Sequence, residues 1–431
     1  MCRRKNNKLL KVRFNSILKI IHTADWHLGH TLHGMSREFE HQKFLDWLLD
    51  TLDEQAADAL IIAGDVFDSA NPPASAQSML YHFLALVNHR FPKLQVVLVG
   101  GNHDSAARLD APQPLLQELN VHVVGGISRD KDDQLNSQQL LVPLIDKQGG
   151  VAAWCVAVPF LRPGDLLPVD GDDDPLIQGV RDIYGEALAE ARARVLPGQA
   201  IVATGHCYMV GAALSELSER KILGGNQHAL PVDIFPADIA YAALGHLHLA
   251  QSVGGRDAVR YSGSPIPLSL AENVYPHQVV SVDIDGDKCV NWSPIRVPRT
   301  VEILRLPSKE SLPLAQILSL LTEQDLPESV PEQNWPYMEV SVLLDRPEPG
   351  LRRSIDEALE GKGVRLLKLT THYPGDGASL AERMPESNLQ DLSPDEVFNR
   401  RYQQVHNDSP PQPLMAAFHQ ILEQVQQESE L

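Results

Sequence analysis

Short apolar runs alternate with longer amphipathic segments over the first two thirds of the chain. The six clearest runs are rich in Val, Ile and Ala and lie at 18–24, 58–64, 94–100, 152–159, 200–205 and 239–245. Most are apolar at successive positions, which is typical of strands covered on both faces by helices or by a second sheet. The segments between the first three runs carry apolar residues at helical spacing: Phe44, Leu45, Leu48, Leu49 and Leu52 in one, and Met79, Leu80, Phe83, Leu84 and Val87 in the other. This alternation predicts an α/β domain with a largely parallel sheet arrangement over residues 18–285.

From Arg299 onward the pattern predicts a smaller βαβαβ unit, over residues 299–372. Its strand candidates are 301–307, 337–344 and 364–370, with helix candidates at 314–321 and 351–359. Residues 373–392 are polar and contain Gly and Pro, which indicates a linker. Residues 393–431 predict two short amphipathic helices, the first opening with Ser393 and Glu396 in a capping-box arrangement. This pair either folds back on the body or presents a groove to a partner helix.

Net charge, the length of apolar stretches and the spacing of the cysteines indicate which classes of protein and which cellular compartment fit this chain. The 431 residues carry a net charge of -19, which argues against a broad basic face that grips nucleic acid. Uninterrupted apolar stretches stay short of the roughly 18 residues needed to cross a bilayer, so we expect no membrane span. The cysteines, Cys2, Cys155, Cys207 and Cys289, lie far apart, which fits a reducing, cytoplasmic location. The basic residues 1–17 are expected to be a disordered extension rather than a cleaved signal.

Polar side chains gather where five of the predicted strands end. They are Asp25 and His27, Asp65 and Asp68, Asn102, His103 and Asp104, His206, and finally His246 and His248. Any one of these groups alone would be an ordinary turn or an ordinary histidine. Sites in open α/β sheets form at the carboxyl ends of strands, and oxygen and imidazole donors without thiolate suit manganese, iron or zinc. Seven donors drawn from these ten side chains are too many for one ion and suit two ions that share a carboxylate.

The charge of such a centre favours phosphate even on an acidic chain. Two divalent ions bring four positive charges, whereas Asp25 and Asp65 supply only two negative ones, because the amide and the imidazoles are neutral. Two ions about 3.5–4 Å apart can activate a bridging hydroxide and clamp both oxygens of an in-line displacement. The sequence therefore favours hydrolysis of a phosphoester.

The order of these motifs, D-x-H, GD-x-x-D, GNHD, GH and GH-x-H, resembles the calcineurin-like metallophosphoesterase superfamily. That resemblance covers residues 18–285 and implies a β-sandwich flanked by helices. The runs HTADWHLGH, AGDVFDSANPP, GGNHDS, ALGHLH and RYSGSPIPLSLAE are similar to the nuclease subunits of the SbcCD type, which act in double-strand-break repair. The similarity implies that residues 299–372 form a DNA-capping domain. It also implies that residues 393–431 are a helix-loop-helix that binds the coiled coil of an SbcC-type ATPase.

Transferred residue by residue, the resemblance assigns roles to the site. It places Asp25, His27 and His248 on one metal and Asn102, His206 and His246 on the other, with Asp65 bridging the two; the usual ion is Mn2+. His103 would contact the phosphate and assist the leaving group, and Asp104 would orient it. Archaeal relatives carry a second catalytic histidine at the position of Asp68, so this chain departs from them there.

The function implied by the resemblance is that of a two-metal DNA phosphodiesterase gated by an ATPase. It would act as an exonuclease on duplex ends and as an endonuclease on hairpins or single strands. Two nuclease and two ATPase subunits would assemble, and the partner and metals would supply the attraction for DNA. Two alternatives stay open: the same centre acting on nucleotides or another phosphoester, and a non-catalytic scaffold for the ATPase. The scaffold predicts lost ligands, whereas every expected donor is present.

Overall fold

The computed structural model describes residues 17–167, 174–212, 229–308, 310–324, 326, 330–346 and 348–373, together with residues 398, 402, 411, 414, 415 and 418. Contacts divide the chain into two units. The first comprises Met1–Val342 and Gly350–Thr370, and the second comprises Leu343–Pro349 and Thr371–Leu431. Everything that positions the site belongs to the first unit.

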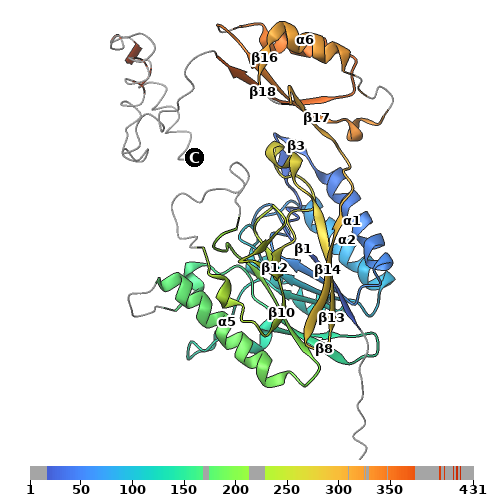
Figure 1. Ribbon diagram of the computed structural model, residues 1–431, viewed down its shortest axis with the longest axis vertical. Helices are drawn as coiled ribbons and strands as arrows, with labels where there is room; N and C mark the ends of the chain where they lie inside the picture. Colours follow the sequence, from blue (N-terminus) through green and yellow to red (C-terminus); the bar gives the residue numbers. More distant parts are fainter. Residues whose placement is uncertain are drawn as a thin grey trace, which may run out of the picture. The chain divides into compact units, whose positions relative to one another are not determined.

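A six-stranded sheet with the order β14-β13-β1-β4-β5-β6 carries the first three polar motifs. Its strands β1, β13 and β14 are labelled in Figure 1. Its strands are β1 (Leu18–Thr23), β4 (Ala59–Ala63), β5 (Gln95–Val99), β6 (Val121–Val124), β13 (Gln278–Asp285) and β14 (Lys288–Arg296). The strands from β1 to β6 run parallel, and β13 and β14 add to β1 in antiparallel fashion. This sheet therefore extends to Arg296, past the domain boundary at residue 285 that the sequence predicts.

A second six-stranded sheet, with the order β11-β12-β10-β9-β8-β7, carries the last two motifs. Its strands are β7 (Leu141–Ile145), β8 (Val151–Ala157), β9 (Ala200–His206), β10 (Ile239–Gly245), β11 (Gln251–Val253) and β12 (Arg256–Tyr261). The run β8-β9-β10-β12 is parallel. β7 and β11 pair with it in antiparallel fashion. The predicted strands of both sheets are confirmed.

The two sheets pack face to face, and helices cover their outer faces. Along β4, Ala59 and Ile61 belong to the core between the sheets, whereas Leu60 and Ile62 pack against helices. This is the period of two expected when both faces of a strand are buried. The helices over the first sheet are α1 (Glu38–Glu54) and α2 (Ala74–Arg90), and α5 (Pro175–Arg194) packs on the second. The predicted β-sandwich flanked by helices is thereby confirmed.

Shorter elements connect the strands. They are β2 (Thr31–Leu32), β3 (Met35–Ser36), α3 (Ala106–Asp110), α4 (Gln113–Gln117), η1 (Ser137–Leu140), η2 (Pro163–Asp165), η3 (Val232–Ile234) and η4 (Leu270–Val274). The last of these, a 3-10 helix, recurs below because it lies beside the site. Among the residues described, no helix has the length and apolar character that a membrane span requires.

The predicted βαβαβ unit follows the sandwich. It consists of β15 (Ile303–Leu306), β16 (Leu312–Pro313), α6 (Leu314–Glu323), η5 (Glu332–Asn334), β17 (Tyr337–Leu343), α7 (Leu351–Ala358) and β18 (Arg365–His372). β15 and β17 are parallel neighbours, and β18 pairs with β17. The predicted extension and most of the predicted linker and helix pair lie outside the described residues. Of the helix pair, the rings of Phe398 and Phe418 stack with their centroids 4.2 Å apart.

Candidate metal centre

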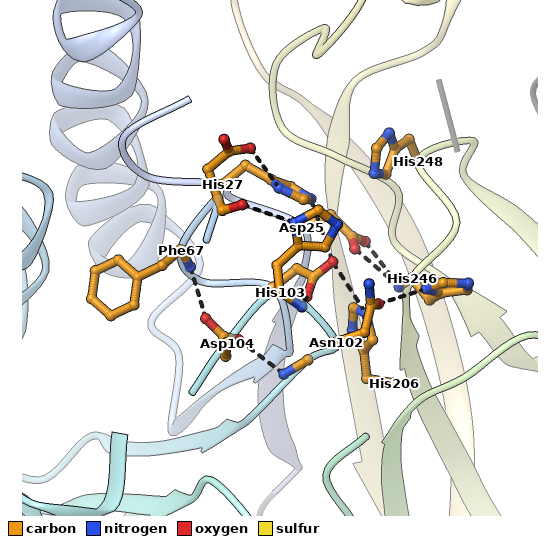
Figure 2. A network of polar contacts seen from close by, with 12 residues as sticks. Asp25, His27, Phe67, Asn102, His103, Asp104, His206, His246 and His248 are labelled. Carbon is orange, nitrogen blue, oxygen red and sulfur yellow. Dashed lines mark hydrogen bonds and ion pairs between the residues drawn. The ribbon is translucent and has the colours of Figure 1, made fainter. Parts of the chain in front are cut away.

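The carboxyl ends of five parallel strands meet at one edge of the sandwich and bring the five polar motifs together (Figure 2). The turns after β1, β4 and β5 carry Asp25 and His27, Asp65 and Asp68, and Asn102 to Asp104. β9 ends at His206, and the turn after β10 carries His246 and His248. The two sheets thus contribute donors from opposite sides of one site.

The backbone is strained at several of these donors. Asp25, His27 and Asp65 have φ values of 56°, 48° and 48°, and His246 has a φ of 109°. Side chains other than glycine rarely adopt positive φ, and such residues persist only where the surroundings hold them. Here the Asp25 N–H donates to Gly64 O at 3.0 Å, and the His27 N–H donates to Asp65 O at 3.0 Å. The two turns therefore fix each other, and the strain directs their side chains into the site.

Two glycines are required because other groups of the site approach them closely. A Cβ atom on Gly101 would lie 2.1 Å from Oδ1 of Asp65, and one on Gly64 would lie 2.2 Å from Nδ1 of His206. Gly64 also has a φ of 91°. Glycine has no Cβ atom and therefore lets other groups approach the backbone closely. The structure shows that the groups approached are protein side chains of the site itself.

One group of donors consists of Asp25, His27 and His248, all buried, whose donor atoms lie within 4.8 Å of one another. Each imidazole is held through Nδ1: that of His27 contacts Oδ1 of Asp68 at 3.2 Å, and that of His248 contacts Oε1 of Glu272 at 3.0 Å. Each ring would therefore bind a metal through Nε2. Nε2 of His27 is buried without a hydrogen-bond partner. A buried nitrogen of this kind is what a metal ligand is expected to present before the cation binds.

The second group is built around Asn102. Its Oδ1 lies 3.0 Å from Nε2 of His206 and 3.0 Å from Nδ1 of His246. The His206 ring is fixed because its Nδ1 donates to Ala63 O at 2.9 Å. Oδ2 of Asp65 lies 3.3 Å from Nε2 of His206 and 3.5 Å from Nε2 of His27, so this carboxylate faces both groups. The donor set therefore fits two divalent cations that share Asp65.

The pKa values of these groups depend on burial and on their charged neighbours. Burial disfavours the imidazolium of His206, yet the neighbouring Asp65 carboxylate outweighs it and raises the pKa of His206 to about 9. Burial, with the adjacent His206, lowers the pKa of His246 to about 3. Burial raises the pKa of Asp25, whereas the surrounding histidines hold the pKa of Asp65 well below its usual range despite its burial. A cation that binds here must therefore displace a proton from His206.

His103 lies beside the two groups and its ring is held by Asp68. Its Nδ1 donates to the main-chain carbonyl of Asp68 at 2.8 Å, and its ring stands edge-on to that of His27 with centroids 4.8 Å apart. The main-chain N–H of His103 donates to Oδ1 of Asp65 at 2.9 Å. These contacts hold the ring through Nδ1 rather than Nε2.

Asp104 has a different role from the one expected. Its carboxylate accepts backbone N–H groups from Gly101 at 2.9 Å, Val66 at 3.1 Å and Phe67 at 2.9 Å. These bonds tie the turn after β5 to the turn after β4 (Figure 2). The group that holds the His103 ring is the carbonyl of Asp68, so Asp104 supports the loops rather than the imidazole.

Sequence reasoning missed three supporting contacts. Glu272 holds His248 from 24 residues away, and nothing in the spacing predicts that pairing. The carboxylate of Asp68 holds His27, whereas the sequence shows only a departure from archaeal relatives. Arg162 donates from Nη2 to Asp104 O at 3.0 Å and places a cation beside the GNHD turn.

Comparisons with known proteins agree with this geometry. Residues 18–250 match the family model described as calcineurin-like phosphoesterase, and residues 299–406 match SbcD_C, described as type 5 capsule protein repressor C-terminal domain. The fold and the donor set thus define a member of the calcineurin-like phosphoesterases.

The relatives narrow that class to one family. The SbcD subunit of nuclease SbcCD from Rhodobacter capsulatus is 40% identical over 389 residues, which cover 88% of this chain and 93% of the relative. The Escherichia coli K12 protein of the same name is 34% identical over 393 residues, covering 89% and 92%. The crystal structure of Pseudomonas putida nuclease MPE aligns over 44% of this chain and 64% of the nuclease chain, with 16% sequence identity and a TM-score of 0.19. A TM-score this low does not establish a shared fold. The chain belongs to the SbcD family of SbcCD nuclease subunits.

Proposed function

We propose that this chain is the nuclease subunit of an SbcCD-type complex and hydrolyses DNA phosphodiesters at a two-metal centre. The observation that carries the proposal is the convergence of seven oxygen and nitrogen donors, with Nε2 of His27 buried and without a hydrogen-bond partner. Asp25, His27 and His248 would hold the first cation, and Asn102, His206 and His246 the second. Asp65 would bridge them. The relatives are named as subunits of a nuclease, which supports a nucleic acid as the substrate.

The chain's own residues would divide the chemistry between them. When bound, the cations supply Lewis-acid activation of water and neutralise charge that develops on the phosphate. Asp68 would keep the His103 ring oriented through its carbonyl, so that Nε2 faces the phosphate. The ring would act in its imidazolium form, keeping the Nδ1 proton on Asp68 and giving the Nε2 proton to the leaving oxygen. Asp104 and Arg162 would hold the turn that carries Asn102 and His103.

The finer features of the proposal rest on the family resemblance. We propose exonuclease action on duplex ends, endonuclease action on hairpins or single strands, and Mn2+ as the ion. We also propose a cytoplasmic assembly of two copies of this chain with two copies of an SbcC-type coiled-coil ATPase. Such a partner would supply positive charge that a chain of net charge -19 lacks.

One assay tests the proposal directly. The full chain, with Mn2+, is incubated with linear duplex DNA, hairpin DNA and a small phosphodiester, with and without the ATPase and ATP. We expect Mn2+-dependent cleavage of DNA that the ATPase stimulates. Hydrolysis of the small ester without cleavage of either DNA, even with the partner, would contradict a nuclease and favour another phosphoester. No hydrolysis of any substrate in the presence of both metals and partner would favour a scaffold.

A further inference from the structure

His248, in the turn after β10, is oriented by a buried carboxylate. Oε1 of Glu272 lies 3.0 Å from Nδ1 of His248, and Oε2 accepts the Leu268 N–H at 2.9 Å. Both side chains are buried, and that of Glu272 is 0% exposed. A carboxylate that accepts from one imidazole nitrogen fixes the ring and its tautomer and makes the other nitrogen a better metal ligand. Glu272 therefore has the geometry of a positioning residue for the first cation.

Asn273, which follows Glu272 in the chain, forms hydrogen bonds with residues at the start of the βαβαβ unit. Nδ2 of Asn273 donates to the carbonyl of Ile303, in β15, at 2.9 Å. Oδ1 of Asn273 accepts a hydrogen bond from Nη1 of Arg299 at 3.0 Å, and the main-chain carbonyl of Asn273 accepts one from Nη2 of the same guanidinium at 3.1 Å. Arg299 lies in the short connection between β14 and β15. Two consecutive residues of η4 thus bond to the metal centre on one side and to the first strand of the βαβαβ unit on the other.

Apolar packing holds the same segment against the same strand. Leu270, the first residue of η4, belongs to one buried cluster with Leu32, Val301, Ile303 and Tyr337. Packed clusters have few alternative arrangements, so they transmit displacements rather than absorb them. A shift of β15 is therefore expected to move η4 as a unit, and Glu272 with it.

We propose that η4 couples the metal centre to the βαβαβ unit. In this proposal Glu272 sets the orientation of His248, and Asn273 and Leu270 fix η4 on β15. Displacement of the βαβαβ unit then changes the affinity of the centre for its first cation. The inference rests on the proposed function in one respect, namely that His248 is a metal ligand. Its consequence is that a macromolecule that moves the βαβαβ unit would alter metal occupancy without touching the metals.

The positioning role of Glu272 is tested by Mn2+ titration of the metal-free full chain in a calorimeter, which does not depend on DNA cleavage. We expect Glu272→Ala to weaken one of two Mn2+ sites by about 10- to 100-fold, as loss of such partners does elsewhere. Glu272→Gln keeps an oxygen that can accept the Nδ1 proton and should retain part of that affinity. If Glu272→Ala fails to fold, Glu272→Gln alone decides: unchanged affinity at both sites overturns the positioning role.

The coupling is tested with Asn273→Ala, which removes the side-chain bonds to Ile303 and Arg299 and touches no proposed ligand. Asn291→Ala is the matched control, because the exposed side chain of Asn291 bonds from β14 across to Asp283 of β13, at 3.3 Å. We expect Asn273→Ala to weaken the same Mn2+ site several-fold and Asn291→Ala to leave it unchanged. Equal affinities in the two variants would overturn the coupling while leaving Glu272 as a positioning residue.

A double-mutant cycle separates coupling from a general loss of stability. If the effect of Asn273 passes through Glu272, then Asn273→Ala should weaken Mn2+ binding less in a Glu272→Gln background, where only part of the contact to His248 remains, than in the wild-type chain. Additive effects on affinity would overturn that route. A wild-type chain that binds two Mn2+ ions and cleaves no DNA would contradict the proposed function alone, since the cycle is measured on binding.

Discussion

At the scale of single residues, Asn102 and His103 are neighbours in sequence with different surroundings. Asn102 faces the imidazoles of the second donor group, whereas the His103 ring is held on the carbonyl of Asp68. We predict that His103→Gln keeps both Mn2+ ions and lowers turnover by about 10²- to 10⁴-fold, the range of a lost general acid. Asn102→Ala should instead weaken the second Mn2+. Calorimetric titration beside single-turnover cleavage distinguishes the two, and loss of an ion in His103→Gln would reverse the assignments.

The raised pKa of His206 predicts how metal binding depends on pH. Because that pKa is about 9, the ring carries a proton at neutral pH in the metal-free chain, and a cation must displace it. Mn2+ affinity should therefore rise between pH 6.5 and pH 8.5, by up to about tenfold per pH unit for one released proton. Titrations in Tris and in MOPS, whose ionisation enthalpies differ, measure the protons released. Equal apparent enthalpies in both buffers would show that His206 is already neutral.

At the scale of elements, a buried ion pair connects the start of α1 to β17. Arg37, which is 0% exposed, pairs with Glu40 and donates to the carbonyl of Pro267 at 2.7 Å. Tyr337, the first residue of β17, donates from its hydroxyl to Glu40 at 3.0 Å. Arg37→Met would leave the Glu40 carboxylate buried without its partner, so we predict a loss of about 3–5 kcal/mol in the free energy of unfolding.

Urea unfolding measures that loss, and two variants control it. Arg90→Met removes an arginine whose partners Asp50 and Asp53 are exposed, and should lower the free energy of unfolding far less than Arg37→Met does, because exposed ion pairs are screened by water. The double variant Arg37→Met with Glu40→Met should be more stable than Arg37→Met alone, because it removes the uncompensated charge. If the double variant loses as much stability as the two single variants together, Arg37 and Glu40 do not stabilise the protein as a pair.

The elements themselves were largely predictable, and the reason is local. In β4 the apolar run is short, glycine ends it and both faces are buried, so periodicity and composition identify the strand. The motifs at strand ends likewise indicate which side chains meet, because parallel strands end at one edge. The pairing of Glu272 with His248 was not predictable, since it depends on how η4 packs after the sheet is complete. The backbone contacts of Asp104 were not predictable either, because its three donors come from two turns that are far apart in the sequence.

At the scale of the whole molecule, net charge and local charge have opposite signs. A chain of net charge -19 repels DNA, while the seven donors contain only two carboxylates and so leave bound divalent cations with excess positive charge. Several other cations are paired with carboxylates: Arg305 and Lys368 both contact Glu339, Arg352 contacts Asp356 and Arg353 contacts Glu357. This pattern supports the proposal that the metals and a partner supply the attraction for DNA.

That partner is expected to bind the C-terminal segment 393–431, where the rings of Phe398 and Phe418 stack with their centroids 4.2 Å apart. An aromatic pair contributes about 0.5–1.5 kcal/mol beyond the area it buries, so its loss should loosen the two predicted helices. We predict that Phe398→Ala weakens co-purification with an SbcC-type ATPase and leaves Mn2+ binding unchanged. Phe91→Ala, at the end of α2, controls for the loss of a ring elsewhere. Undiminished capture of the ATPase by both Phe398→Ala and Phe418→Ala would show that the partner binds another part of the chain.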